Sequence, residues 1–121
     1  MKVGSFKEDL VFYSEDAELC YRMRQHGYRI AYLPTARMWH KVETTLAKNR
    51  ALQLRYSTRN NLFLLQNYRV GFHPITLLIH LFAVCPVKMA IFAVLLRWAN
   101  ARGIYRGIRD WRQGRYGWII E

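Results

Sequence analysis

Three acidic side chains lie within four positions of a chain that is otherwise strongly basic. They are Glu15, Asp16 and Glu18, and the apolar run Leu10–Tyr13 precedes them. A positioned carboxylate can act as a general base that takes the proton from a hydroxyl nucleophile. It can equally lie in the first turn of a helix, where the helix dipole favours negative charge without any chemistry. The residues alone favour this second, structural interpretation.

The elements around the acids can be predicted from capping and stop signals. Ser14 can accept a hydrogen bond from the first free N–H groups of a helix over Glu15–His26, and Gly27 supplies a left-handed stop. Leu10–Tyr13 and Tyr28–Leu33 are rich in aromatic and branched residues and predict short strands. The acids would then lie at a strand-to-helix junction, where a sheet tends to present groups to a ligand.

Six short segments follow one another in an order and spacing that a single family shares. They are Val3–Phe6, Phe12–Arg22, Gly27–Ile30, Leu33–Pro34, Trp39–His40 and Arg55–Asn60. Together they resemble the C-terminal part of the family 2 glycosyltransferases, and most closely the rhamnosyltransferase-like members. The resemblance implies an α/β architecture, namely the C-terminal fragment of a GT-A (nucleotide-diphospho-sugar transferase) fold followed by membrane-associated α-helices.

The resemblance also implies a chemistry. Enzymes of that family transfer a sugar with inversion from a nucleotide-sugar donor to a lipid-linked or glycan acceptor, in the synthesis of cell-surface polysaccharide or glycolipid. Asp16 matches the position of the family's catalytic base, and Glu15 is its neighbour in the acidic pair. His40 matches a histidine that in many relatives helps bind the diphosphate and a divalent metal, Mg²⁺ or Mn²⁺. Without the resemblance, a histidine that hydrogen-bonds locally would be the preferred interpretation of His40.

Three further residues are candidates for substrate binding. Arg22 and Arg59 offer the planar guanidinium that suits a diphosphate or a lipid phosphate. Trp39 offers an aromatic face on which a sugar can stack. Each has a structural alternative, because the arginines could be salt-bridge partners and the tryptophan a buried aromatic residue.

The sequence departs from the family in what it lacks. The family's N-terminal, nucleotide-binding half ends in an Asp-x-Asp metal motif, and no Asp-x-Asp occurs among the 121 residues. A Gly-rich phosphate loop is also missing from the sequence. We therefore expect an acceptor-side half of an active site that is doubtful as an enzyme alone. A separate chain that carries the other half is a possible partner.

Composition limits the other possibilities. A chain of 121 residues has room for one small domain, and its net charge of +11 implies an anionic partner such as membrane lipid, nucleic acid or a phosphorylated substrate. The two cysteines, Cys20 and Cys85, are too few for a disulfide framework or a zinc site. Cys20 falls on the apolar side of the expected first helix, which predicts that it is buried.

The chain divides into four segments. Residues 1–45 carry the acceptor-side portion, and residues 46–72 form a linking helix from about Leu46 to Tyr68. Residues 73–98 are apolar and membrane-associated, either as one span that tolerates Lys88 or as a hairpin or interfacial pair broken at Pro86. Residues 99–121 form a basic amphipathic segment whose arginines favour an anionic membrane surface. By the positive-inside rule the catalytic portion should be cytoplasmic.

Two other functional classes compete with a glycosyltransferase. One is a non-catalytic, basic membrane-associated protein, or a partner subunit, in which the acidic cluster is only a helix cap. The other is a nucleic-acid binder. We do not expect nucleic acid as a partner, because the arginines alternate with apolar residues suited to lipid and no nucleic-acid motif is present.

Overall fold

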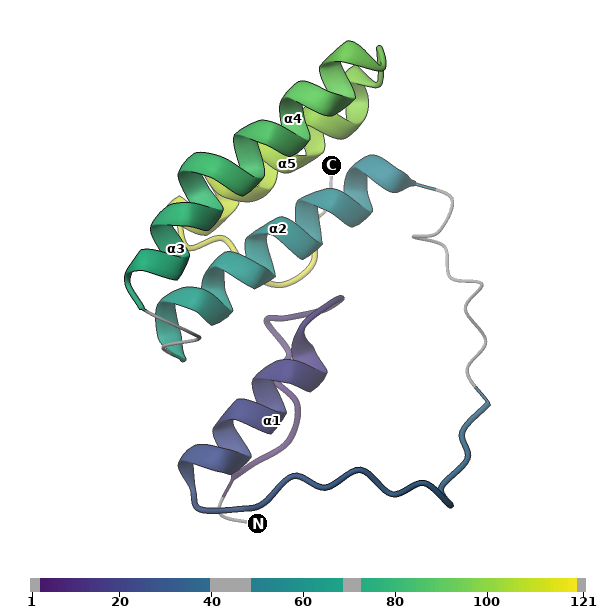
Figure 1. Ribbon diagram of the computed structural model, residues 1–121, viewed down its shortest axis with the longest axis vertical. Helices are drawn as coiled ribbons and strands as arrows, with labels where there is room; N and C mark the ends of the chain where they lie inside the picture. Colours follow the sequence, from purple (N-terminus) through teal and green to yellow (C-terminus); the bar gives the residue numbers. More distant parts are fainter. Residues whose placement is uncertain (1–2, 40–48, 69–72, 120–121) are drawn as a thin grey trace.

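The computed structural model describes residues 3–39, 49–68 and 73–119 (Figure 1). Within these ranges the chain is helical and contains no β-strand. The elements, in chain order, are α1 (Glu15–Gln25), α2 (Arg50–Asn67), α3 (Ile75–Ile79), the π-helical turn η1 (His80–Val84), α4 (Cys85–Val94) and α5 (Trp98–Arg112).

Neither predicted strand is formed in the described residues. At the first, Leu10–Tyr13, the backbone leaves the extended conformation because Tyr13 has a φ of 66°. At the second, Tyr28–Leu33, the chain runs away from the helices as an open trace (Figure 1). The side chains of this segment are exposed. A strand is stabilised by hydrogen bonds to a neighbouring backbone. No other described segment lies beside this trace, so the expected α/β arrangement is not formed here.

Helix α1 begins and ends where the sequence predicts. Gly27 follows it with a φ of 83°, in the left-handed region that closes a helix. Ser14 holds the N-cap position, but its side chain makes no capping bond, so that prediction was wrong. Cys20 is exposed rather than buried, because the buried side of α1 carries Glu18 in place of an apolar residue.

The apolar segment forms one continuous helix from Ile75 to Val94, made of α3, η1 and α4. It is called helix 75–94 below. Pro86 does not break it into a hairpin, so that alternative was wrong. Proline lacks the N–H that an α-helix needs, and the wider π-helical turn just before it is a common way to absorb the missing bond. The helix is long and apolar enough to cross a membrane, and most of its surface is exposed.

Helices α2, 75–94 and α5 pack together, and we call them the three-helix unit. Leu54, Cys85 and Ile104 form its buried apolar centre, one residue from each helix. The approach of α5 to α2 is especially close, because a Cβ atom on Gly103 would lie 2.3 Å from the carbonyl oxygen of Ala51. Gly107 meets α2 in the same way one turn later. The N-cap of α2 is Asn49, whose side chain accepts a hydrogen bond from the N–H of the helix's third residue.

A buried ion pair reinforces this packing. The guanidinium of Arg55 in α2 donates to both carboxylate oxygens of Asp110 in α5, at 2.5 Å and 3.3 Å. Both side chains are almost fully shielded from solvent. A charge at this depth is tolerated only when its partner is present, so the pair ties α2 and α5 to one register.

Candidate functional site

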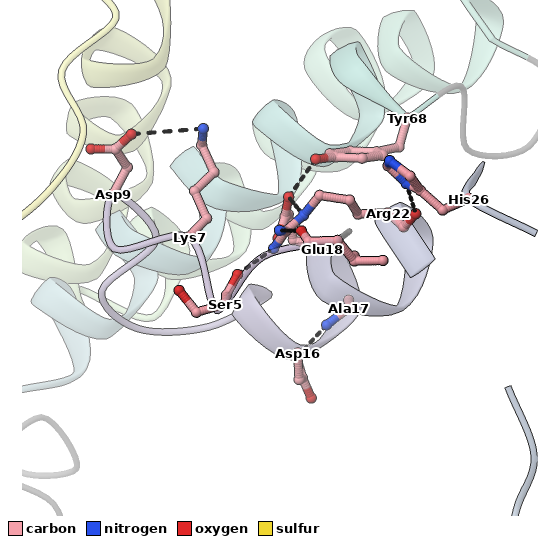
Figure 2. Close-up of polar contacts among 10 residues, drawn as sticks. Ser5, Lys7, Asp9, Asp16, Ala17, Glu18, Arg22, His26 and Tyr68 are labelled. Atoms are coloured by element: carbon pink, nitrogen blue, oxygen red, sulfur yellow. Dashed lines mark hydrogen bonds and ion pairs between the residues drawn. The ribbon is translucent and has the colours of Figure 1, made fainter. Parts of the chain in front are cut away.

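The acidic residues of α1 have different environments. Asp16 is exposed, and its Oδ1 accepts a hydrogen bond from the N–H of Ala17 at 2.7 Å. Figure 2 shows its carboxylate on the side of α1 away from Tyr68 and the other polar contacts. Glu15 is half-buried, and its buried Oε2 has no hydrogen-bond partner among the described residues. These two carboxylates are therefore the ones with unused hydrogen-bonding capacity.

Glu18, in contrast, is buried and fully occupied. Its two oxygens accept hydrogen bonds from the guanidinium of Arg22, at 3.0 Å and 2.8 Å, and from the hydroxyl of Tyr68 at the end of α2 (Figure 2). Burial alone would raise the pKa of Glu18, but the bonds from Arg22 and Tyr68 outweigh it and lower the pKa. Burial and the bond to Glu18 raise the pKa of Tyr68 to about 12. Glu18 is thus a structural anion.

Arg22 joins the N-terminal loop to α1. Besides Glu18, its guanidinium contacts the backbone carbonyl oxygens of Val3 and Ser5, the latter at 2.7 Å. Most of its donors are therefore directed to the protein. Arg22 also lines an open groove of about 370 Å³ together with Ser5, Phe6, Lys7, Glu18 and Tyr68. Its predicted contact with a substrate phosphate stays a prediction.

The turn before α1 is strained. Tyr13 and Ser14 have φ values of 66° and 72°, in the left-handed region that side chains rarely adopt. Residues in such conformations persist where the surroundings hold them, and they cluster at functional sites. Asp16, in the first turn of α1, follows this strained turn directly and is exposed.

Polar side chains of α2 hold this turn. The side-chain amide of Asn60 donates to the carbonyl oxygens of Phe12 and Tyr13, at 2.7 Å and 2.9 Å. Ser14 Oγ donates to Asn61 Oδ1 at 2.9 Å. The amide of another α2 residue, Gln53, donates to the hydroxyl of Tyr13. We did not predict a role for Gln53 or Asn61, because only the family-like segment Arg55–Asn60 marked this stretch of the sequence.

Arg59 is fully buried. Its guanidinium donates to the backbone carbonyl oxygens of Asp9, Arg115 and Gly117, at distances of 3.1–3.4 Å. The ring of Tyr56 lies 4.9 Å from the guanidinium carbon. Burial lowers the pKa of Arg59. In this structure Arg59 connects α2 to the loop before α1 and to the C-terminal tail, and its predicted contact with a substrate stays a prediction.

Of the other two candidates, the structure places only Trp39, and it lies apart from the acids. Trp39 is 86% exposed, at the end of the open trace that runs away from α1 (Figure 1). It is not a buried aromatic residue, and its role in sugar stacking stays a prediction. His40 lies outside the described residues, so the structure does not place it.

The described residues do not form a metal site by themselves. No three of their His, Cys, Asp or Glu side chains come together in a way that could hold a metal ion. The unpartnered Oε2 of Glu15 is one oxygen of the kind that Mg²⁺ or Mn²⁺ prefers, and a single such ligand is too few. A metal ion at these carboxylates would need further ligands from outside the described residues.

Comparison with known proteins agrees with the motif analysis. The chain matches the family model described as "Glycosyl transferase family group 2" over residues 1–119. Searches of curated proteins and of solved structures find no significant match. Because the family match covers nearly all of the sequence, including the acidic cluster, the turn before it and all three helices of the three-helix unit, the chain belongs to glycosyl transferase family group 2.

Proposed function

We propose that this chain supplies the acceptor side of an inverting, nucleotide-sugar-dependent glycosyltransferase site at a membrane, with Asp16 as the general base. One observation carries the proposal: α2 holds the strained turn at Tyr13 and Ser14 in place, and the turn presents the exposed carboxylate of Asp16. A base must be accessible to the hydroxyl proton that it removes, and Glu18 is excluded by its burial and its bonds.

In this proposal the Asp16 carboxylate accepts the proton of an acceptor hydroxyl while the hydroxyl oxygen attacks the anomeric carbon of the donor sugar. The bond from that carbon to the nucleoside diphosphate breaks at the same time, and the diphosphate leaves with the bonding electrons. Glu15 precedes it in the same helical turn, and its negative charge favours a protonated neighbour, as a general base requires. The acceptor is a lipid-linked or glycan hydroxyl, and the site faces the cytoplasm. Any Mg²⁺ or Mn²⁺ ion would take further ligands from outside the described residues, such as His40 or a partner chain, and the same partner would complete the donor site.

A second candidate function rests on the bond between Asp16 Oδ1 and the N–H of Ala17. This bond satisfies a free donor at the start of α1, which is what a helix cap does. The chain would then be a non-catalytic membrane-associated protein or a partner subunit. Asp16 would serve only the helix.

The substitution Asp16→Asn separates the two functions. Asparagine keeps an acceptor oxygen and caps helices about as well as aspartate, but it cannot take up a proton. For a general base we expect sugar transfer to fall by roughly 10²–10⁴-fold while the helical content stays unchanged. The assay uses the purified chain in detergent with Mn²⁺ and a panel of UDP-, GDP- and dTDP-sugars.

Gln25→Asn is the matched control, because Gln25 is an exposed polar residue of the same helix far from the turn. Transfer that survives Asp16→Asn would contradict the assignment of the base. A chain that binds none of the donors, alone or with a partner that carries an Asp-x-Asp half, would favour the second candidate function.

A further inference from the structure

Helix 75–94 exposes an apolar stripe along its whole length. Phe82 is 76% exposed and Val94 82% exposed. The stripe, which we call the lipid stripe, consists of Leu78, Ile79, Phe82, Val87, Ile91 and Val94. An exposed apolar surface of this length in water marks a contact with another protein or with lipid.

The opposite side of helix 75–94 is used for packing. Cys85 is buried against Leu54 and Ile104, and Met89 and Phe92 pack against the same cluster. One face of the helix therefore packs against α2 and α5, and the opposite face is exposed and has no partner among the described residues. A helix that crosses lipid as an isolated span has no need for such a division.

Helix α5 packs beside helix 75–94 (Figure 1). It carries exposed arginines from its second turn to its last. They are Arg102, Arg106, Arg109 and Arg112. Trp98 and Tyr105 are exposed on α5 as well, and such rings favour the boundary between lipid and water. Because α5 is about 22 Å long, these groups extend over most of the length of its neighbour.

The arginines of α5 limit the orientations that helix 75–94 can adopt in a membrane. If the helix crossed the bilayer, α5 would be carried into the hydrocarbon, and several arginines would lie at depths where they are strongly disfavoured. α5 cannot remain outside the bilayer while helix 75–94 crosses it. The contacts of Gly103 and Gly107 with the α2 backbone and the buried pair Arg55–Asp110 fix it in the three-helix unit.

We propose that the three-helix unit lies flat on an anionic lipid surface, with the lipid stripe of helix 75–94 embedded in the plane of the interface and the α5 arginines among the lipid phosphates. This orientation satisfies both surfaces at once, since apolar side chains enter the acyl region while guanidinium groups remain at the headgroups. It also keeps the acidic cluster in water, because α1 lies on the other side of α2 from helix 75–94 (Figure 1). The inference rests on the membrane association proposed above.

Oriented circular dichroism tests the orientation directly. The full chain is added to aligned bilayers of phosphatidylcholine and phosphatidylglycerol in equal amounts, and light is passed along the bilayer normal. The amide band polarised along the helix axis is kept when helices lie in the plane and lost when they cross the bilayer. We expect the band to be kept, and its loss would overturn the proposal. Sugar transfer plays no role in this readout, so a failed enzymatic assignment would leave the result unchanged.

Partitioning to vesicles of the same composition tests the surface. We expect Phe82→Asp to weaken binding by at least about tenfold, because it replaces a large embedded side chain by a charge. Gln25→Asp adds the same charge on α1 and should leave binding unchanged. The pair Arg102→Gln and Arg109→Gln should weaken binding by about fivefold per arginine at low salt, and not at all with neutral vesicles.

Three results would contradict the surface. Phe82→Asp could bind as tightly as the unchanged chain. The arginine variants could lose nothing on anionic vesicles. The unchanged chain could also ignore vesicles and sediment as a dimer that covers the stripe with a second copy. Each of these outcomes would remove lipid as the occupant of the stripe.

Discussion

The N-terminal region of the molecule, residues 3–39, and the three-helix unit are held together by different means. In the three-helix unit the backbones of α2 and α5 approach so closely at Gly103 that no side chain fits between them. In the N-terminal region the apolar side chains of Val3 and Leu10 are buried, and the rings of Phe12 and Tyr21 contact rings at α2 and its C-cap. The turn before α1 is held by hydrogen bonds as well. Backbone carbonyls of the loop accept hydrogen bonds from side chains of α2, chiefly from Asn60 and Arg59.

The difference indicates that two sides of α2 have different structural roles. One side of this helix contributes to tight packing that specifies the scaffold, and another carries the amides that position the turn in front of Asp16. The guanidinium of Arg59 bonds to the earlier loop and to the C-terminal tail. Packing errors should therefore unfold the scaffold. Errors in the polar anchors should displace the acidic cluster and leave the scaffold intact. Local stability differs across most proteins in this way, and it can be measured.

The largest effect should come from Gly103→Ala. Alanine stabilises a helix relative to glycine by about 1 kcal/mol when nothing opposes it. Here the new methyl group would lie 2.3 Å from a backbone oxygen of α2, which cannot move aside without separating the helices. We expect a net loss of about 3 kcal/mol in the free energy of unfolding, measured by chemical denaturation in mild detergent.

Arg109→Ala provides the comparison on the same helix. Arg109 is exposed, so its replacement should change the stability by less than about 0.5 kcal/mol. If Gly103→Ala instead stabilised the chain, the close contact between α2 and α5 would not exist in solution. The distinction between the N-terminal region and the three-helix unit would then lose its basis.

A smaller and more local effect is expected from Asn60→Ala. The substitution leaves the carbonyl oxygens of Phe12 and Tyr13 without their donor, at a cost of about 2 kcal/mol. Hydrogen exchange should become faster in α1 and in the turn before it, while α5 exchanges as before. Asn67→Ala is the matched control, because Asn67 lies on the same helix, is exposed and, within the described residues, bonds to a carbonyl of its own helix. Equal acceleration in α5 would show that the anchor supports the whole molecule.

Local signals in the sequence predicted the local structure. The bounds of α1, its glycine stop and the basic helix α5 follow from patterns within a few residues, and the structure confirms them. The strand predicted at Tyr28–Leu33 failed because strands depend on a partner backbone, which a periodicity of side chains does not supply. The tight contact at Gly103 was likewise invisible, since its partner lies about fifty residues away in sequence.

For the candidate site, too, the sequence predicted the residue types but not their environments. The acidic cluster was found from residue types, and the family match supports its ancestry. Which of its acids is free could not be predicted. Glu18 is buried because Tyr68, at the far end of α2, supplies a hydroxyl to it. Arg22 and Arg59 donate hydrogen bonds to backbone carbonyl oxygens of distant residues. The positions of those carbonyls depend on the fold, so these bonds could not be predicted from the sequence.

The smallest effect concerns pH and tests whether Glu18 is an anchor at all. Its pKa in the folded chain is lowered from 4.5, so its ionised form stabilises the fold at pH values well above 4.5. That contribution is lost as the pH falls through the lowered pKa. We expect Glu18→Gln to cost about 1 kcal/mol at neutral pH, and the gap to the unchanged chain should close in acid. Tyr68→Phe retains the Arg22 partner and should keep the acid dependence. A gap that stays constant with pH would mean that the charge of Glu18 does not matter, and that Arg22 is held by its carbonyl contacts alone.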